Sequence, residues 1–101
     1  MTDKASTARP AAQPVKQLEN ERVIVTEWRF APGAETGWHR HEHDYVVVPL
    51  TTGTLMLETP EGERTADLKI GQSYSRPVGV EHNVINANAF DLAFIEIELK
   101  A

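Results

Sequence analysis

The stretch "FDLAFIEIELK", residues 90–100, decides the fold class. In its second half apolar residues alternate with charged ones: Ile95, Ile97 and Leu99 against Glu96, Glu98 and Lys100. Such alternation is typical of a β-strand, because successive side chains of a strand point to opposite faces. We therefore expect a strand whose isoleucines lie on a buried face and whose glutamates lie on a solvated one.

Further short segments rich in β-branched and aromatic residues precede this strand. They are "RVIVTEWRF" (22–30), "YVVVPL" (45–50), "TLMLET" (54–59), "ERTADLKI" (63–70), "QSYSR" (72–76) and "HNVIN" (82–86). Stretches with Gly, Pro or Asn, such as "APGAETG", "PEG" and "NAN", separate most of them. No helical period of three turns occurs after residue 21. About eight short strands at this spacing predict an all-β barrel or two-sheet jelly roll.

The composition is that of one globular domain preceded by a tail. The chain has 101 residues, no cysteine and a net charge of -5. The acidic balance argues against nucleic acid or acidic membranes as partners, and no apolar run is long enough to span a bilayer. Residues 1–18, rich in Ala, Thr, Ser and Pro, are expected to form a flexible tail before a domain at 19–101. This tail lacks the apolar centre of a secretory signal, so we expect a cytoplasmic protein.

Three of the four histidines lie in "GWHRHEHDY", residues 37–45, and the fourth is His82. His39 and His41 would share one face of an extended strand and supply two neighbouring metal ligands. His82, which follows the turn "PVGVE", is the remaining imidazole. Three imidazoles suit a transition metal such as Fe, Zn, Ni or Mn rather than Mg or Ca. The alternative is a solvated, charged loop, and spacing alone does not decide between the two.

Two motifs in the chain resemble those of the cupin superfamily. Gly33, His39, His41 and Gly53 fit the first motif. Gly71, Pro77, Gly79, His82 and Asn86 fill every specified position of the second. The resemblance implies an all-β, single-domain cupin, a small double-stranded β-helix or jelly-roll barrel, with one divalent transition metal ion held inside. It implies His39, His41 and His82 as the metal ligands.

The first motif departs from the family at its glutamate. Tyr45 and Val46 occupy the expected window. Valine binds no metal, and a phenol has a pKa near 10, so direct ligation by Tyr45 needs a large pKa shift. We expect Tyr45 to act on a metal-bound water or a substrate; simple core packing is the alternative. His43 is expected at the rim of the site.

Other residues near the motifs have expected places outside the metal ligands. Arg76 shares strand parity with Tyr74 and is a candidate for binding a substrate carboxylate by a bidentate pair, or else a surface arginine. Trp28 is a candidate for an apolar pocket lining. Trp38 is expected to point outward, into packing or an oligomer contact.

The expected function is that of a metal-dependent, dioxygenase-like or Lewis-acid enzyme acting on a small anionic metabolite. A centre of three neutral imidazoles keeps the full charge of a divalent ion, which favours an anionic ligand. The two motif regions are also similar to those of small cupins of β-alanine degradation. The alternative is a non-catalytic ligand-binding or sensor cupin, because the fold alone does not decide function. Apolar strand faces that so small a barrel leaves uncovered predict a homodimer.

Overall fold

The computed structural model describes residues 8–100, and all regular structure within that range is β-strand. The strands are β1 (Gln13–Glu19), β2 (Val23–Phe30), β3 (His39–Arg40), β4 (Asp44–Pro49), β5 (Gly53–Thr59), β6 (Gly62–Leu68), β7 (Tyr74–Arg76), β8 (Glu81–Asn86) and β9 (Leu92–Leu99). The predicted all-β class is confirmed. In this range no helix has the length and apolar character that crossing a membrane requires.

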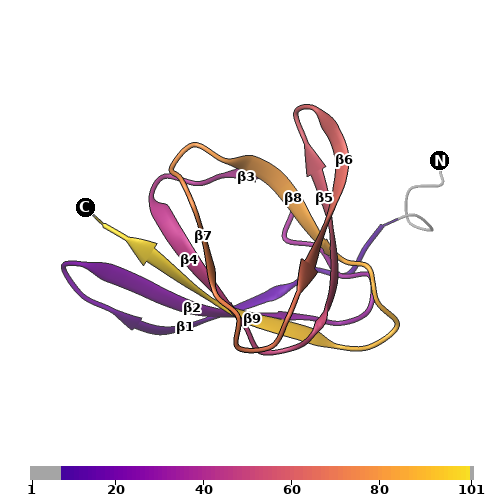
Figure 1. Cartoon of the computed structure of the whole chain (residues 1–101), viewed down its shortest axis with the longest axis horizontal. Coiled ribbons are helices and arrows are strands. Elements are labelled where there is room, and N and C mark those ends of the chain that lie inside the picture. Colours follow the sequence, from indigo (N-terminus) through magenta and orange to yellow (C-terminus); the bar gives the residue numbers. More distant parts are fainter. Residues whose placement is uncertain (1–7, 101) are drawn as a thin grey trace.

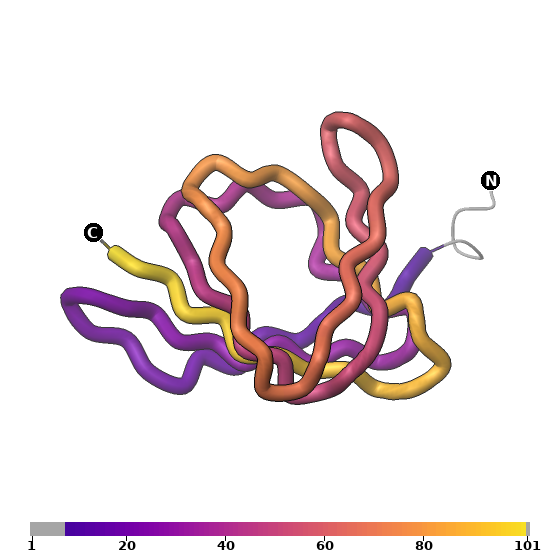
Figure 2. Tube along the Cα trace, in the orientation of Figure 1, coloured from indigo at the N-terminus to yellow at the C-terminus, as the bar shows by residue number. Residues whose placement is uncertain are grey.

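The strands form two antiparallel sheets that face each other. One has the order β1-β2-β9-β4-β7 and the other the order β3-β8-β5-β6. Figures 1 and 2 show the chain winding round a barrel, from which the β1–β2 and β5–β6 hairpins project. Both sheets contribute to the core, which includes Phe30, Val47, Leu55, Leu57, Leu92 and Phe94. Burial of these side chains is the main source of stability.

Asn86 ties the end of β8 to the opposite sheet. Its side chain is almost fully buried and donates to the carbonyl groups of Phe30, Ala31 and Phe90, over 3.2, 3.2 and 2.8 Å. These carbonyls lie at the end of β2, directly after it and shortly before β9, and that of Ala31 also accepts a hydrogen bond from the amide of Ala34. Asn86, the last specified position of the second motif, therefore hydrogen-bonds the backbone where the chain leaves the sheets.

Part of the predicted flexible tail is ordered. The prediction placed residues 1–18 in the tail, but Gln13–Glu19 form β1 and pair with β2 from Gln13↔Arg29 to Glu19↔Ile24. β1 is mostly exposed and has no apolar face, so the sequence pattern gave no sign of it. Main-chain hydrogen bonds to the edge of β2 order this segment instead. Residues 1–7 of the predicted tail lie outside the described residues.

The expected orientation of β9 is wrong. Leu92, Phe94 and Glu96 are buried inside the barrel, whereas Ile95 and Ile97 are half-buried on the outer face of the five-stranded sheet. The strand has apolar residues on both faces, and the face that carries Leu92 and Phe94 is the one that points into the barrel. A carboxylate therefore lies inside the barrel and isoleucines lie outside it.

Candidate metal centre

Two paired strands, β3 and β8, and the segment after β3 bring the three histidines of the two motifs together. His39 of β3 is paired in register with His82 of β8. The next segment is held by main-chain bonds, since the amide of His41 donates to the carbonyl of Val80 and the amide of Gly79 donates to that of His41. Gly79 has a φ of 96°, a conformation that glycine adopts at low cost. The turn before β8 thereby fixes His41 beside His82.

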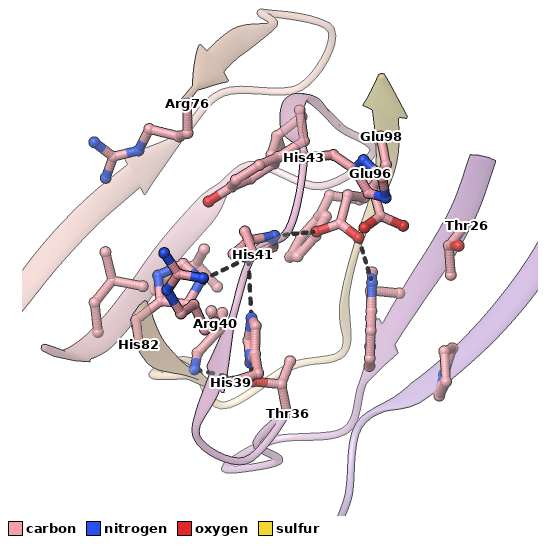
Figure 3. Close-up of a pocket in the computed structure, with 18 of the residues that line it drawn as sticks. Thr26, Thr36, His39, Arg40, His41, His43, Arg76, His82, Glu96 and Glu98 are labelled. Carbon is pink, nitrogen blue, oxygen red and sulfur yellow. Dashed lines mark hydrogen bonds and ion pairs between the residues drawn. The ribbon is translucent and has the colours of Figure 1, made fainter. Parts of the chain in front are cut away.

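The three imidazoles point toward one another inside the barrel (Figure 3). Nε2 of His41 lies 3.0 Å from Nε2 of His39 and 3.1 Å from Nε2 of His82. One ligand nitrogen from each residue can be chosen so that all three lie within 4.8 Å. Two nitrogens bound to one ion at about 2.1 Å lie roughly 3.0–3.4 Å apart for angles between a right angle and the tetrahedral one. The spacing therefore suits neighbouring ligands of one metal ion.

The surroundings of His39 select the tautomer that a metal needs. Nδ1 of His39 lies 2.9 Å from the carbonyl oxygen of Gly37, which can only accept a hydrogen bond. Nδ1 therefore carries the proton, and the lone pair is on Nε2, inside the cluster. The amide of Gly37 in turn donates to Oδ1 of buried Asn83 over 2.9 Å, which holds the loop in place.

Burial keeps the other two imidazoles neutral. It lowers the pKa of His41 to about 3, with further lowering by the charges of His39 and His82. Burial likewise lowers the pKa of His82 to about 4, with smaller contributions from His39 and Arg76. A neutral imidazole is the form that binds metal, so these two side chains need no deprotonation near pH 7.

A cation satisfies this cluster better than hydrogen bonds do. Nε2 of His41 faces two other ring nitrogens but carries at most one proton while the ring is neutral. It can therefore make only one well-directed hydrogen bond, and the second contact brings lone pairs together. A transition metal ion between the three nitrogens would accept all three lone pairs, so the donor set fits such an ion.

Tyr45 lies against the cluster, and its burial disfavours the ionised form that could bind a metal. Its ring stacks on His41, with centroids 3.9 Å apart and an interplanar angle of 15°. Burial raises the pKa of the Tyr45 hydroxyl, which the charge of Arg76 only partly offsets. A protonated phenol is a hydrogen-bond donor and a poor metal ligand. The stacking also shows that the ring fills the barrel beside His41.

Arg76 lies at the mouth of the same cavity. It pairs in register with Tyr45 across β4 and β7, so both side chains leave the same face of the sheet. The cavity has a volume of about 450 Å³. Its lining includes the polar residues Arg40, Glu42, His43, Arg76 and Glu98 and the apolar residues Val47, Leu55, Leu57, Val84 and Phe94. His43 is half-buried in this lining, apart from the three clustered histidines. Trp38 is 53% exposed and is absent from the lining.

Glu96 is the site residue that the sequence interpretation missed. It is buried on the inner face of β9, where its Oε2 lies 3.9 Å from Nδ1 of His41 and its Oε1 accepts a hydrogen bond from Nε1 of Trp28 over 3.4 Å (Figure 3). Burial raises the pKa of Glu96 to about 7, helped by the charge of Glu98 and opposed by the bond from Trp28. The sequence shows that Glu96 shares a strand face with Leu92 and Phe94, but not that this face is the inner one.

This fold and this cluster define a class of protein. The model of the cupin domain family matches residues 26–98, and the chain belongs to that family. The chain is similar to the beta-alanine degradation protein BauB of Pseudomonas aeruginosa. The two share 67% identity over 94 residues, which cover 93% of this chain and 99% of BauB.

Solved structures show the same fold. A cupin domain protein of Bordetella pertussis superimposes with a TM-score of 0.92 at 65% identity, covering 93% of this chain and 98% of that one. A cupin of Methanocaldococcus jannaschii with a double-stranded β-helix fold has a TM-score of 0.74 at 17% identity, covering 88% and 80% of the two chains. The latter likeness concerns the fold alone.

Proposed function

We propose that the protein is a metal-dependent enzyme that acts on a small anionic metabolite in the degradation of beta-alanine or a related amino acid. The observation that carries this proposal is the convergence of three imidazole nitrogens inside a cavity of about 450 Å³. His39, His41 and His82 would hold one divalent ion of Fe, Zn, Ni or Mn. The similarity to BauB supports the pathway, since 99% of that protein is covered at 67% identity.

The residues around the cluster have distinct tasks in this proposal. A bound ion would supply Lewis acidity and open coordination positions. Arg76, at the mouth, attracts an anionic substrate and can pair with a carboxylate through two parallel hydrogen bonds. Tyr45 remains protonated because of its burial and can donate a hydrogen bond into the cavity. The apolar side chains in the lining exclude water from the part of the substrate that they contact.

Three measurements test the proposal. Elemental analysis of protein purified without added metal should find one transition metal ion per chain. Oxygen uptake should then be screened with small amino and thiol acids, because dioxygenase-like chemistry is the expected reaction. In addition, the chain should restore growth on beta-alanine to a Pseudomonas aeruginosa strain that lacks BauB, whereas a His41→Ala variant should not. Failure of both chains to restore growth would contradict the pathway assignment.

The second candidate function is that of a non-catalytic ligand-binding or sensor cupin. One observation favours it: a buried tyrosine occupies the position of the first motif's glutamate, so this position offers no carboxylate to the metal. Binding of small anions without any turnover in the screen would select this function.

As a macromolecular partner we propose a second copy of the chain. The outer face of the five-stranded sheet carries half-buried apolar side chains on three adjacent strands: Val23 and Val25 of β2, Val46 and Val48 of β4, and Ile95 and Ile97 of β9. A symmetric dimer places one such face against the same face of its partner. The cytoplasmic location expected from the sequence stays a prediction.

A further inference from the structure

Glu96 is a charged side chain in the interior that neither cupin motif accounts for. Its neighbours on the inner face of β9, Leu92 and Phe94, are core residues, and Glu96 itself is only 9% exposed. Burying a carboxylate is costly unless hydrogen-bond donors surround it. A buried Glu96 therefore needs a partner whose interaction offsets the free energy of desolvation.

The contacts of Glu96 lead to the metal cluster through His41. Trp28 donates to Oε1, and Oε2 faces Nδ1 of His41 at 3.9 Å. Within residues 8–100, Nδ1 of His41 makes no hydrogen bond, because Oε2 of Glu96 at 3.9 Å lies beyond hydrogen-bond distance, whereas Nε2 of the same ring faces the other two histidines. The carboxylate and the cluster thus lie at opposite nitrogens of one imidazole (Figure 3).

This arrangement matches a recurring pattern in metalloproteins. A ligand histidine commonly donates its second N–H to a carboxylate, which fixes the tautomer and orientation of the ring and raises its basicity. Tyr45, stacked on the face of His41, restricts tilting of the ring but does not select a tautomer. The carboxylate of Glu96 faces Nδ1 of His41 at 3.9 Å and can favour a proton there by its charge, whereas the carbonyl of Gly37 does so for His39 through a hydrogen bond over 2.9 Å.

We propose that Glu96 is a positioning residue for the metal centre: it holds His41 with the proton on Nδ1 and the lone pair on Nε2, with Trp28 keeping the carboxylate in place. When Glu96 is ionised, it also places a negative charge beside His41, whereas Tyr45 at the glutamate position of the first motif offers none. The inference rests on the proposed metal site. It assigns a role to Glu96 and Trp28 that does not depend on which substrate the cavity takes.

The test is a measurement of metal affinity by competition with a chromophoric chelator, using Co²⁺ and Zn²⁺. Glu96→Ala should lower the affinity by about 10- to 100-fold, the usual effect of removing a carboxylate behind a histidine ligand. Glu96→Gln retains an acceptor oxygen without the charge and should lose less than Glu96→Ala. Trp28→Phe, which frees the carboxylate from its hydrogen bond, should also weaken binding.

Glu98→Gln is the matched control. Glu98 lies two residues further along β9 and lines the same cavity, so the variant removes an equal charge, but no ion pair joins Glu98 to His41. Its metal affinity should stay close to that of the unsubstituted protein. The absorption bands of the Co²⁺ form should change in Glu96→Gln and stay unchanged in Glu98→Gln. A loss of folding alone would not produce this difference between the two variants.

The outcomes separate the two proposals. Unsubstituted protein that takes up no metal would overturn the proposed function and this inference together. Metal uptake by the unsubstituted protein, with unchanged affinity in both Glu96 variants, would overturn the inference alone. Thermal unfolding of the metal-free variants identifies any that fail to fold, and Glu96→Gln, which keeps the shape of the side chain, then decides the result.

Discussion

Individual side chains at the cluster differ in what they should contribute to metal binding. His41→Ala removes the imidazole that lies between the other two. We expect the variant to retain no metal after purification, since two imidazoles are a poor site for a divalent ion. Elemental analysis checks this, with His43→Ala as the control, because His43 lines the cavity outside the cluster and its loss should leave one ion per chain.

Tyr45 should behave differently from the histidines. Tyr45→Phe removes only the hydroxyl and retains the ring that stacks on His41. We expect metal content to stay near one ion per chain while any turnover falls, because the hydroxyl acts on the substrate or on a metal-bound water. Tyr45→Ala should instead destabilise the fold by about 3–5 kcal/mol, since it leaves a cavity in the core. Loss of metal from Tyr45→Phe equal to that from His41→Ala would identify the phenol oxygen as a ligand.

The resemblance of the two motifs to those of the cupin superfamily predicted which histidines gather, whereas the spacing of the histidines alone left a solvated loop as an alternative. The inward position of Glu96 was not predicted, because the two faces of this alternating strand carry similar numbers of apolar residues. Choosing the inner face required knowing that Leu92 and Phe94 meet the opposite sheet, which is a tertiary fact. The hydrogen bond that sets the His39 tautomer could not be predicted either, because it depends on where the loop places the carbonyl of Gly37.

Strand ends carry their own interactions, and one of them should depend on pH. Glu19, at the end of β1, pairs with Lys100, just after β9, and with Lys16. The hydrogen bond from Lys100, followed by that from Lys16, lowers the pKa of Glu19 to about 2 from an ordinary 4.5. The folded state therefore binds this proton less readily than the unfolded chain. The stabilising contribution is present above pH 4.5 and is lost as the pH falls toward 2.

Glu19→Gln should consequently lower the urea midpoint slightly at pH 7, and the difference from the unsubstituted protein should shrink between pH 4.5 and 2. Because the pair is exposed, added salt should reduce the difference. Glu21→Gln is the control, since Glu21 makes no ion pair within residues 8–100. A difference that persists unchanged at pH 2 would contradict the assignment to this ion pair.

The elements themselves were predictable to different degrees. β2, β4, β5, β6, β7, β8 and β9 follow from β-branched runs between turn residues. β1 and the two-residue β3 do not follow from such runs. They form because their main chains pair with β2 and β8. Short edge strands of this kind depend on a neighbour that the sequence does not reveal.

In the molecule as a whole, a metal ion would join elements that are otherwise linked by few bonds. The ligands come from β8 and from β3 with its following segment, and β3 pairs with β8 over only two residues. An ion that binds only the folded protein stabilises it by about 2.7 kcal/mol at one hundred times its dissociation constant. We therefore expect a chelator to lower the melting temperature of the native protein but not that of His41→Ala, as followed by circular dichroism.

The apolar outer face of the five-stranded sheet and the buried carboxylate of Glu96 have the same cause, which is the orientation of β9. β9 carries Glu96 inward and Ile95 and Ile97 outward, so the strand that serves the cavity also leaves apolar surface in the centre of the sheet. β2 and β4 flank it with valines in register, including Val25↔Ile97 and Val46↔Ile97. A patch of this kind on the face of a sheet is typical of an interface with another protein.

We expect a homodimer across this face. Light scattering at micromolar concentration should give a particle of about twice the 11.3 kDa mass of one chain. Ile97→Glu places a charge at the centre of the patch, where Ile97 contacts both neighbouring strands, and should produce a monomer because an isologous contact buries that charge twice. Thr65→Glu, on the exposed strand β6 of the other sheet, should leave the dimer intact. An 11.3 kDa particle from the unsubstituted protein, or an Ile97→Glu variant that remains a dimer, would show that this face is not the interface.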